Sequence, residues 1–300
     1  MLNLKSNKLT TLPESFGQLS NLISLNLVEN ELLTLPSSFH KLRFLNDLQL
    51  SANKLKSLPS SFSKLQNLVY LSLVNNELES LPESFGQLPN LMYLNLNGNP
   101  LNTLPASFGD LQYLTSLKLY GTSLTTIPTS FAKLSRLEIC ECSPELKIKT
   151  TQKKELKSDH NLKKNKYGYI NQNDKIIIDY LYDEASYYFD EAFGLAIVQR
   201  DGQKFYLNST GKEFLVAYSL AELKTLGTTA KALDLSNQGL EEFPIEISNY
   251  PNLEILILTG NKISSLPSSI GQLNKLMYLD LRTNALNELP DAIGELQQLK

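Results

Sequence analysis

A 23-residue period runs through the first half of the chain without an insertion or a deletion. In a unit such as 68–91, Leu71 and Leu73 alternate with Ser72, as in a strand with one buried face. The period repeats three marker residues: asparagines Asn7, Asn30, Asn53, Asn76 and Asn99; prolines Pro13, Pro36, Pro59, Pro82, Pro105 and Pro128; and phenylalanines Phe16, Phe39, Phe62, Phe85, Phe108 and Phe131.

Each unit is predicted to hold one short strand and one short convex segment. Neither can bury its apolar side alone, so successive units must stack and share a continuous core. Proline fixes φ and lacks a donor, which suits the irregular side of such a stack. We therefore expect an α/β repeat solenoid, with parallel strands on its concave face about 4.7–4.9 Å apart.

The asparagine of each unit is predicted to be structural. It lies where the chain leaves the strand, and its amide both donates and accepts, so it can pair with backbone groups that the bend leaves open. This structural ladder is expected to comprise Asn7, Asn30, Asn53, Asn76, Asn99, Asn261 and Asn284.

The pattern L-x-x-L-x-L-x-x-N-x-L, continued by L-P-x-x-F-x-x-L, resembles the leucine-rich repeat family and its branch with a Leu-Pro pair. The resemblance implies a solenoid that binds other proteins. Proteins with similar repeats often carry a GTPase, kinase or ubiquitin-ligase domain as well.

The repeats are predicted to form two arrays, 1–146 and 233–300. In the first, Glu145 replaces the marker asparagine and Lys147 a leucine, and a lysine-rich linker over 147–165 follows. In the second, the prolines are again 23 apart, at Pro244, Pro267 and Pro290. Pro128 and Pro244 are 116 residues apart, one more than five periods. We therefore expect two separate solenoids that move relative to each other.

Residues 166–216 have a different character, with clustered tyrosines and alternating apolar residues. Tyr167-Gly168-Tyr169-Ile170, Tyr182-Asp183-Glu184-Ala185 and Gly194-Leu195-Ala196-Ile197-Val198 resemble blocks of the tryptophan–glycine (WG) repeat family, with Tyr in place of Trp. We expect a small antiparallel β module with turns at Asn173-Asp174 and Thr210-Gly211. Residues 217–232 are predicted to form a capping helix, with a capping box at Ser219 and Glu222 and a stop at Gly227.

Cys140 and Cys142 fall on the two inward strand positions of the last unit of the first array. They could form a metal or redox pair, but His40 and His160 are distant in sequence. We expect two small, buried apolar residues that bind no metal.

Composition narrows the classes of partner. Charged residues make up 20% of the chain and its net charge is −3, which gives no broad basic surface for nucleic acid. No apolar run is long enough to span a membrane, and no signal peptide is visible, so we expect a cytoplasmic location. Met1 begins at a strand and Lys300 lies inside a repeat. These ends are expected either to be cut from a longer chain or to meet partners.

Two functions remain open. The first is a non-enzymatic protein-interaction scaffold that binds a protein or peptide on the concave face; the second is the regulatory fragment of a larger signalling enzyme. Neither a phosphate loop nor a catalytic triad is present, and no cofactor, metal or small-molecule substrate is expected. Side chains that flank the inward leucines are free for recognition, and we expect the binding site at Tyr70, Tyr93, Tyr120, Val74, Asn95, Asn97 and Lys118.

Overall fold

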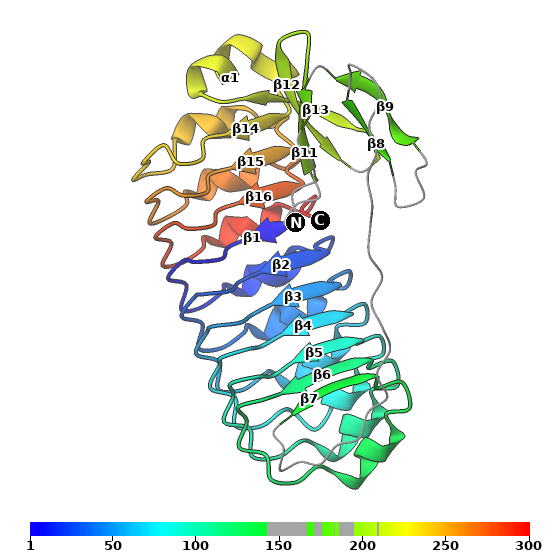
Figure 1. The fold of residues 1–300 in the computed structure, drawn as a ribbon. Helices are drawn as coiled ribbons and strands as arrows, with labels where there is room; N and C mark the ends of the chain where they lie inside the picture. The colour runs from blue at the N-terminus through cyan, green and yellow to red at the C-terminus, as the bar shows by residue number, and fades with distance from the viewer. Residues whose placement is uncertain (143–166, 171–175, 183, 186–194, 209) are drawn as a thin grey trace.

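The computed structural model describes residues 1–142, 167–170, 176–182, 184–185, 195–208 and 210–300. The predicted linker over 147–165 and the predicted turn at Asn173-Asp174 therefore lie outside the described residues. In the described part, short strands line one side of a stack of turns, and 3-10 helices line the other side (Figure 1).

Fourteen of the described strands form one sheet, in the order β10-β11-β12-β13-β14-β15-β16-β1-β2-β3-β4-β5-β6-β7. From β13 onwards in this order all neighbours pair in parallel. This confirms the predicted repeat solenoid. Its repeat strands are β1 (Leu2–Asn3), β2 (Ser24–Asn26), β3 (Asp47–Gln49), β4 (Tyr70–Ser72), β5 (Tyr93–Asn95), β6 (Ser116–Leu119), β7 (Ile139–Cys142), β14 (Ala232–Asp234), β15 (Ile255–Ile257) and β16 (Tyr278–Asp280).

The marker prolines directly precede the short helices of the convex side. Pro59, for example, has φ −61° and ψ 146°, which is extended, and the next residue begins a 3-10 helix. Pro82 differs, since a turn separates it from η4. These helices are η1 (Glu14–Gln18), η2 (Ser37–Lys41), η3 (Ser60–Lys64), η4 (Phe85–Gln87), η5 (Ala106–Asp110), η6 (Thr129–Lys133), η9 (Ile245–Asn249), η10 (Ser268–Gln272) and η11 (Asp291–Glu295).

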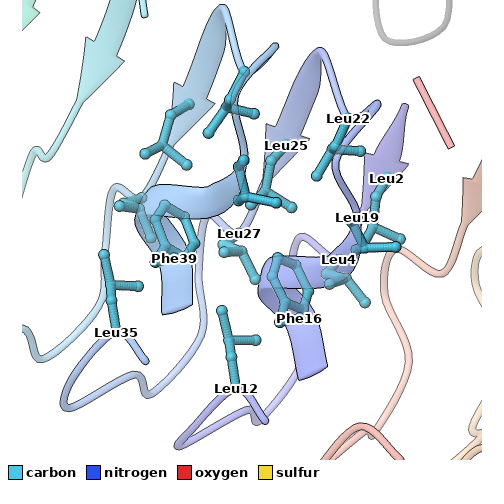
Figure 2. Close-up of a cluster of buried hydrophobic side chains, with 14 of the residues drawn as sticks. Leu2, Leu4, Leu12, Phe16, Leu19, Leu22, Leu25, Leu27, Leu35 and Phe39 are labelled. Atoms are coloured by element: carbon cyan, nitrogen blue, oxygen red, sulfur yellow. The ribbon is translucent and has the colours of Figure 1, made fainter. Parts of the chain in front are cut away.

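Leucines and phenylalanines of successive repeats fill the interior of the stack (Figure 2). The rings of the marker phenylalanines, from Phe16 to Phe131, lie one above the next, with centroids 6.1–6.4 Å apart and nearly parallel planes. In the second array Ile247, Ile270 and Ile293 hold the equivalent place and are fully buried. The core therefore grows by one equivalent layer with each repeat.

Each asparagine of the predicted ladder is hydrogen-bonded to two neighbouring turns. In Asn53, Nδ2 donates to the carbonyl oxygens of Leu27 at 2.9 Å and Leu50 at 3.0 Å, and Oδ1 accepts from the N–H of Leu32 at 3.0 Å. One amide thus pairs with three backbone groups that would otherwise be buried without partners. The same set of three bonds is made by Asn7, Asn30, Asn76, Asn99, Asn261 and Asn284.

The two arrays, although separate in sequence, meet in space. Strand β1 pairs with β16, with Leu2 opposite Leu279, so that the two chain ends lie together at this boundary (Figure 1). We call this contact, between residues 1–8 and 277–286, the seam. The asparagine ladder crosses it, because Asn7 donates to the carbonyl oxygen of Leu281 at 3.0 Å and accepts from the N–H of Leu286 at 3.1 Å.

The seam corrects two expectations. The arrays form one stack, so the expectation that they stay out of phase and move independently does not hold. The offset between Pro128 and Pro244 was counted through the linker, which connects the end of the first array to the start of the second. In the structure, the start of the first array instead joins the end of the second. If Met1 is counted as following Lys300, Leu2 is the twenty-third residue after Leu279, so the period is kept across the seam. Met1 and Lys300 both lie at this boundary, where the amino group of Met1 and the N–H of Lys300 both donate to the carbonyl oxygen of Met277.

The tyrosine-rich module continues the sheet beyond β14. Its strands β10 (Glu184–Ala185), β11 (Leu195–Arg200), β12 (Gln203–Asn208) and β13 (Glu213–Ala217) pair in antiparallel order, and β13 then pairs in parallel with β14. The module therefore covers the end of the stack. Strands β8 (Tyr167–Ile170) and β9 (Ile176–Tyr182) form a separate antiparallel pair.

The predicted capping helix is shorter than expected. Helix α1 spans Leu220–Leu226, and a 3-10 turn, η8 (Gly227–Thr229), follows. Ser219 Oγ accepts from the N–H of Glu222 at 3.1 Å, and the Glu222 carboxylate accepts from the N–H of Tyr218 at 2.8 Å. Gly227 ends the helix with φ 56°, a conformation that glycine adopts without steric cost.

Candidate functional site

The concave face of the first array consists of the side chains of β2–β7 that flank the inward leucines. Tyr70 and Tyr93 occupy equivalent positions on β4 and β5 and are 39% and 44% exposed. Their ring centroids are 6.1 Å apart and the ring planes are inclined by 34°. The two rings therefore form an aromatic surface that is open to solvent.

Asp47 lies beside this pair, opposite Tyr70 in the register of β3 and β4. One carboxylate oxygen, Oδ2, accepts from Ser24 Oγ at 3.2 Å and from Gln49 Nε2 at 3.5 Å. The other, Oδ1, is buried and has no hydrogen-bond partner. Burial raises the pKa of the Asp47 carboxyl, against the opposing effect of the bonds from Ser24 and Gln49.

Three of the other predicted site residues are linked along the next strands. The N–H of Asn97 donates to Asn95 Oδ1 at 3.1 Å, and the N–H of Tyr120 donates to Asn97 Oδ1 at 2.8 Å. Tyr120 is 67% exposed, just beyond the end of β6. Two amides thus hold the backbone near Tyr120, while its ring projects into solvent.

The remaining two predicted residues have smaller roles in this arrangement. Lys118 pairs with Glu141, with Nζ 2.9 Å from Oε1, so its charge is already compensated on the neighbouring strand. Val74 is half-buried, two residues beyond the end of β4. The polar edge of the face is therefore close to neutral at β6 and β7.

The equivalent face of the second array is covered by the module. Ala232 and Ile255 hold the positions on β14 and β15 that Tyr70 and Tyr93 hold in the first array, yet both are fully buried. They pack in one cluster with Tyr206 and other side chains of the module. Tyr206 Oη also donates to Asp234 Oδ2 at 2.7 Å. Burial, with the charge of Asp234, raises the pKa of the Tyr206 hydroxyl.

The cysteine pair departs from expectation in one respect. Cys140 is only half-buried at the edge strand β7, because no further repeat among the described residues covers that side. The expectation that it is buried is therefore wrong for Cys140, whereas the Cys142 side chain lies outside the described part. The described residues contain no group of three or more His, Cys, Asp or Glu side chains placed to hold a metal ion.

Sequence reasoning selected Tyr70 and Tyr93 but not Asp47. The signal was available, since Asp47 is the only charged residue in its row, Ser24, Asp47, Tyr70, Tyr93 and Ser116. No comparable signal in the sequence indicated that the module covers the second array. This covering depends on contacts between β12 and the strands β14 and β15 that no local pattern encodes.

Comparison with known proteins relates the chain to several repeat structures. A leucine-rich repeat protein of Leptospira interrogans is 30% identical, with 98% of this chain and 69% of that chain covered and a TM-score of 0.45. The plant peptide hormone receptor RGFR1, solved in complex with RGF2, is 23% identical, with 99% and 38% covered and a TM-score of 0.43. The Arabidopsis receptor kinase HAESA, solved with the peptide hormone IDA and the co-receptor SERK1, is 24% identical, with 96% and 38% covered and a TM-score of 0.43.

This chain thus spans well under half the length of these two receptor chains. TM-scores below 0.5 give no basis for transferring a ligand or an activity from any of the three. A search of curated proteins found no match. No helix in the described part of the chain is long and apolar enough to cross a membrane.

Family models give the more direct assignment. One, for a leucine-rich repeat region, matches residues 207–300, and another, for leucine-rich repeats, matches residues 45–101. A third, for the WG-containing repeat, matches residues 167–203, within the tyrosine-rich module. Together with the 23-residue period and the stacked parallel strands, these matches show that the chain belongs to the leucine-rich repeat family and carries a WG-like segment between its arrays.

Proposed function

We propose that the protein is a non-enzymatic interaction scaffold that binds a protein or peptide on the concave face of its first array. The observation that carries this proposal is the contrast between the two arrays. In the first array, Tyr70 and Tyr93 are open to solvent. The equivalent positions on β14 and β15 are buried aliphatic residues under the module, Ala232 and Ile255, and the equivalent Tyr278 on β16 is half-buried against the same cluster.

The chemistry of the open face supports binding. Tyrosine combines a large apolar area with a hydroxyl and is enriched among residues that dominate binding energy at interfaces. Tyr70 and Tyr93 leave a large part of their surface in water, so they add little to the core, whereas the leucine that follows each of them, Leu71 or Leu94, is buried. Asn95 and Asn97 supply polar groups at the edge of the aromatic pair, as is usual at the rim of an interface.

The test is a double substitution, Tyr70→Ala with Tyr93→Ala, and capture of binding proteins from the source cells. A protein captured by the wild-type chain is then titrated against each variant. We expect the double variant to lose about 2 kcal/mol or more of binding free energy. Its melting temperature should change little, since both rings are exposed.

A matched control is Tyr113→Ala. Tyr113 is 43% exposed but follows η5 on the convex side, where Arg136 lies over its ring at 4.5 Å. This variant should bind as the wild type does. Unchanged binding by the double variant, or equal loss with Tyr113→Ala, would show that the site lies elsewhere.

A further inference from the structure

The carboxylate beside the tyrosine pair lacks a compensating cation. Asp47 forms no ion pair with any residue in the described part of the chain, and only uncharged groups, Ser24 and Gln49, donate to it. The other outward residues at the flanking positions of β2–β5 are neutral: Ser24, Asn26, Gln49, Tyr70, Ser72, Tyr93 and Asn95. This part of the concave face therefore carries one uncompensated negative charge.

The position of that charge relative to the rings is fixed by strand register. Asp47 is opposite Tyr70, and Tyr70 is opposite Tyr93, so the three side chains occupy one row on adjacent strands. Adjacent strands are about 4.7–4.9 Å apart. A cation placed over the Tyr70 ring would therefore contact the ring face and lie close enough to the Asp47 carboxylate to be attracted by its charge.

Elsewhere in the molecule, an arginine binds a similar combination of a carboxylate and aromatic rings. In the module, Arg200 pairs with Glu213 through two bonds of 2.8 Å. Its guanidinium also lies over the Tyr182 ring at 5.8 Å and the Phe205 ring at 5.4 Å. A carboxylate flanked by two aromatic rings is thus completed by a guanidinium, which can pair with the acid and stack on the rings at once.

We infer that the concave face of the first array recognises an arginine-bearing peptide, whose guanidinium lies over Tyr70 and Tyr93 beside Asp47. This inference rests on the proposed function and specifies its partner. The aromatic faces attract the cation through their quadrupoles, and the half-buried carboxylate adds an attraction that water screens only in part.

A second prediction distinguishes a binding role of Asp47 from a structural role of the same residue. Two observations indicate that ionised Asp47 destabilises the fold. Its Oδ1 is buried without a hydrogen-bond partner, and the pKa of its carboxyl is raised because burial disfavours the ionised form. Replacing Asp47 by asparagine should therefore raise the melting temperature while it weakens binding. A residue kept for stability would show the opposite change in melting temperature.

The experiment uses two labelled peptides of the same sequence, Gly-Ser-Arg-Gly-Ser-Arg-Gly and its counterpart with citrulline in place of both arginines. Citrulline keeps the planar shape and removes the charge. Fluorescence anisotropy on the full chain should show binding of the arginine peptide, with at least tenfold weaker binding of the citrulline peptide. Binding of the arginine peptide should weaken with added salt.

Asp47→Asn should weaken binding of the arginine peptide at least tenfold. Asp110→Asn is the matched control, since it removes the same charge from the convex side, where Asp110 pairs with Lys133. That variant should bind as the wild type does. Equal affinity for both peptides, no binding of either, or wild-type affinity in Asp47→Asn would overturn the inference.

The proposed function can survive such a failure. If a captured partner is lost with Tyr70→Ala and Tyr93→Ala but binds Asp47→Asn normally, the face is a binding site and its ligand is not cationic. If the tyrosine substitutions have no effect on the captured partner, the proposed function itself fails.

Discussion

The α-amino group of Met1 donates to the carbonyl oxygen of Met277 at 2.8 Å, where it takes the place of a peptide N–H in the ladder of the solenoid. One repeat earlier, the N–H of Tyr278 donates to the carbonyl oxygen of Glu254 at 3.1 Å in the equivalent position. Burial, with the nearby charge of Lys300, lowers the pKa of the Met1 amino group to about 4. The amine is therefore neutral in the folded chain at pH 7.

This lowered pKa predicts that the fold weakens as the pH falls. An unfolded amino group has a pKa near 8, so between pH 8 and pH 4 the unfolded chain binds more protons than the folded chain. The contribution of this group to the free energy of unfolding is therefore largest above pH 8. It decreases progressively towards pH 4, by a few kcal/mol in all.

Urea unfolding across this range, with and without Nα-acetylation, measures the effect. The acetylated chain keeps an N–H for Met277 but has no titrating amine, and other titrating groups cancel in the comparison. We expect the free-amine chain to lose more stability than the acetylated chain as the pH falls. Parallel curves would show that the Met1 amine is not buried at the seam.

Asn53→Ala should destabilise the protein by about 1–3 kcal/mol, because it leaves the carbonyl groups of Leu27 and Leu50 and the N–H of Leu32 buried without partners. Asn67→Ala is the control. Asn67 is exposed and donates only to the carbonyl oxygen of Arg43, at 2.7 Å, so its loss should cost far less. Thermal unfolding of the two variants tests this, and equal losses would contradict a structural role for the ladder.

Ala52→Gly should stabilise the protein by about 1 kcal/mol. Ala52 has φ 55°, in the left-handed region that costs an L-residue roughly 1–2 kcal/mol. The equivalent positions in two later repeats are Gly98 and Gly121. Ala106→Gly, at the start of η5 where φ is not positive, should instead lower stability. Chemical denaturation of both variants distinguishes the two signs, and a loss in Ala52→Gly would contradict the prediction.

Tyr206→Phe should loosen the module from the second array. The substitution leaves Asp234 Oδ2 without its donor at a partly buried site, which should cost about 1–3 kcal/mol. Amide hydrogen exchange in β12 should therefore accelerate. Tyr113→Phe, which removes a hydroxyl from an exposed ring, should leave exchange unchanged. If Tyr206→Phe exchanges like the wild type, the bond to Asp234 does not hold the module in place.

Local repetition explains which features the sequence could predict. Leu71, Asn76 and Phe85 recur at fixed spacing because each repeat solves the same packing problem in the same way, and the structure gives each of them the surroundings that the period implies. Strand type, core rows and backbone pairing therefore follow from one unit.

The features that escaped prediction depend on contacts between distant segments. The pairing of Leu2 with Leu279 has no signature within either array, and an offset counted along the linker suggested separation instead. Likewise, nothing local in Tyr206 indicates that its hydroxyl reaches Asp234. At the candidate site, the row of outward residues that contains Asp47 could be recognised in the sequence. That its Oδ1 is buried without a hydrogen-bond partner follows only from the three-dimensional structure.

The seam also has a consequence for how the chain folds. Within each array a strand pairs with one 23 residues away, whereas Met1 and Met277 are 276 positions apart in sequence. Contacts between neighbouring repeats require only short loops to close, but the seam requires the whole chain to return on itself, which is entropically costly and slow. The arrays should therefore form first and the seam last, as a late step of high contact order. A permuted chain in which Lys300 leads directly into Met1 would turn that late step into one more local addition.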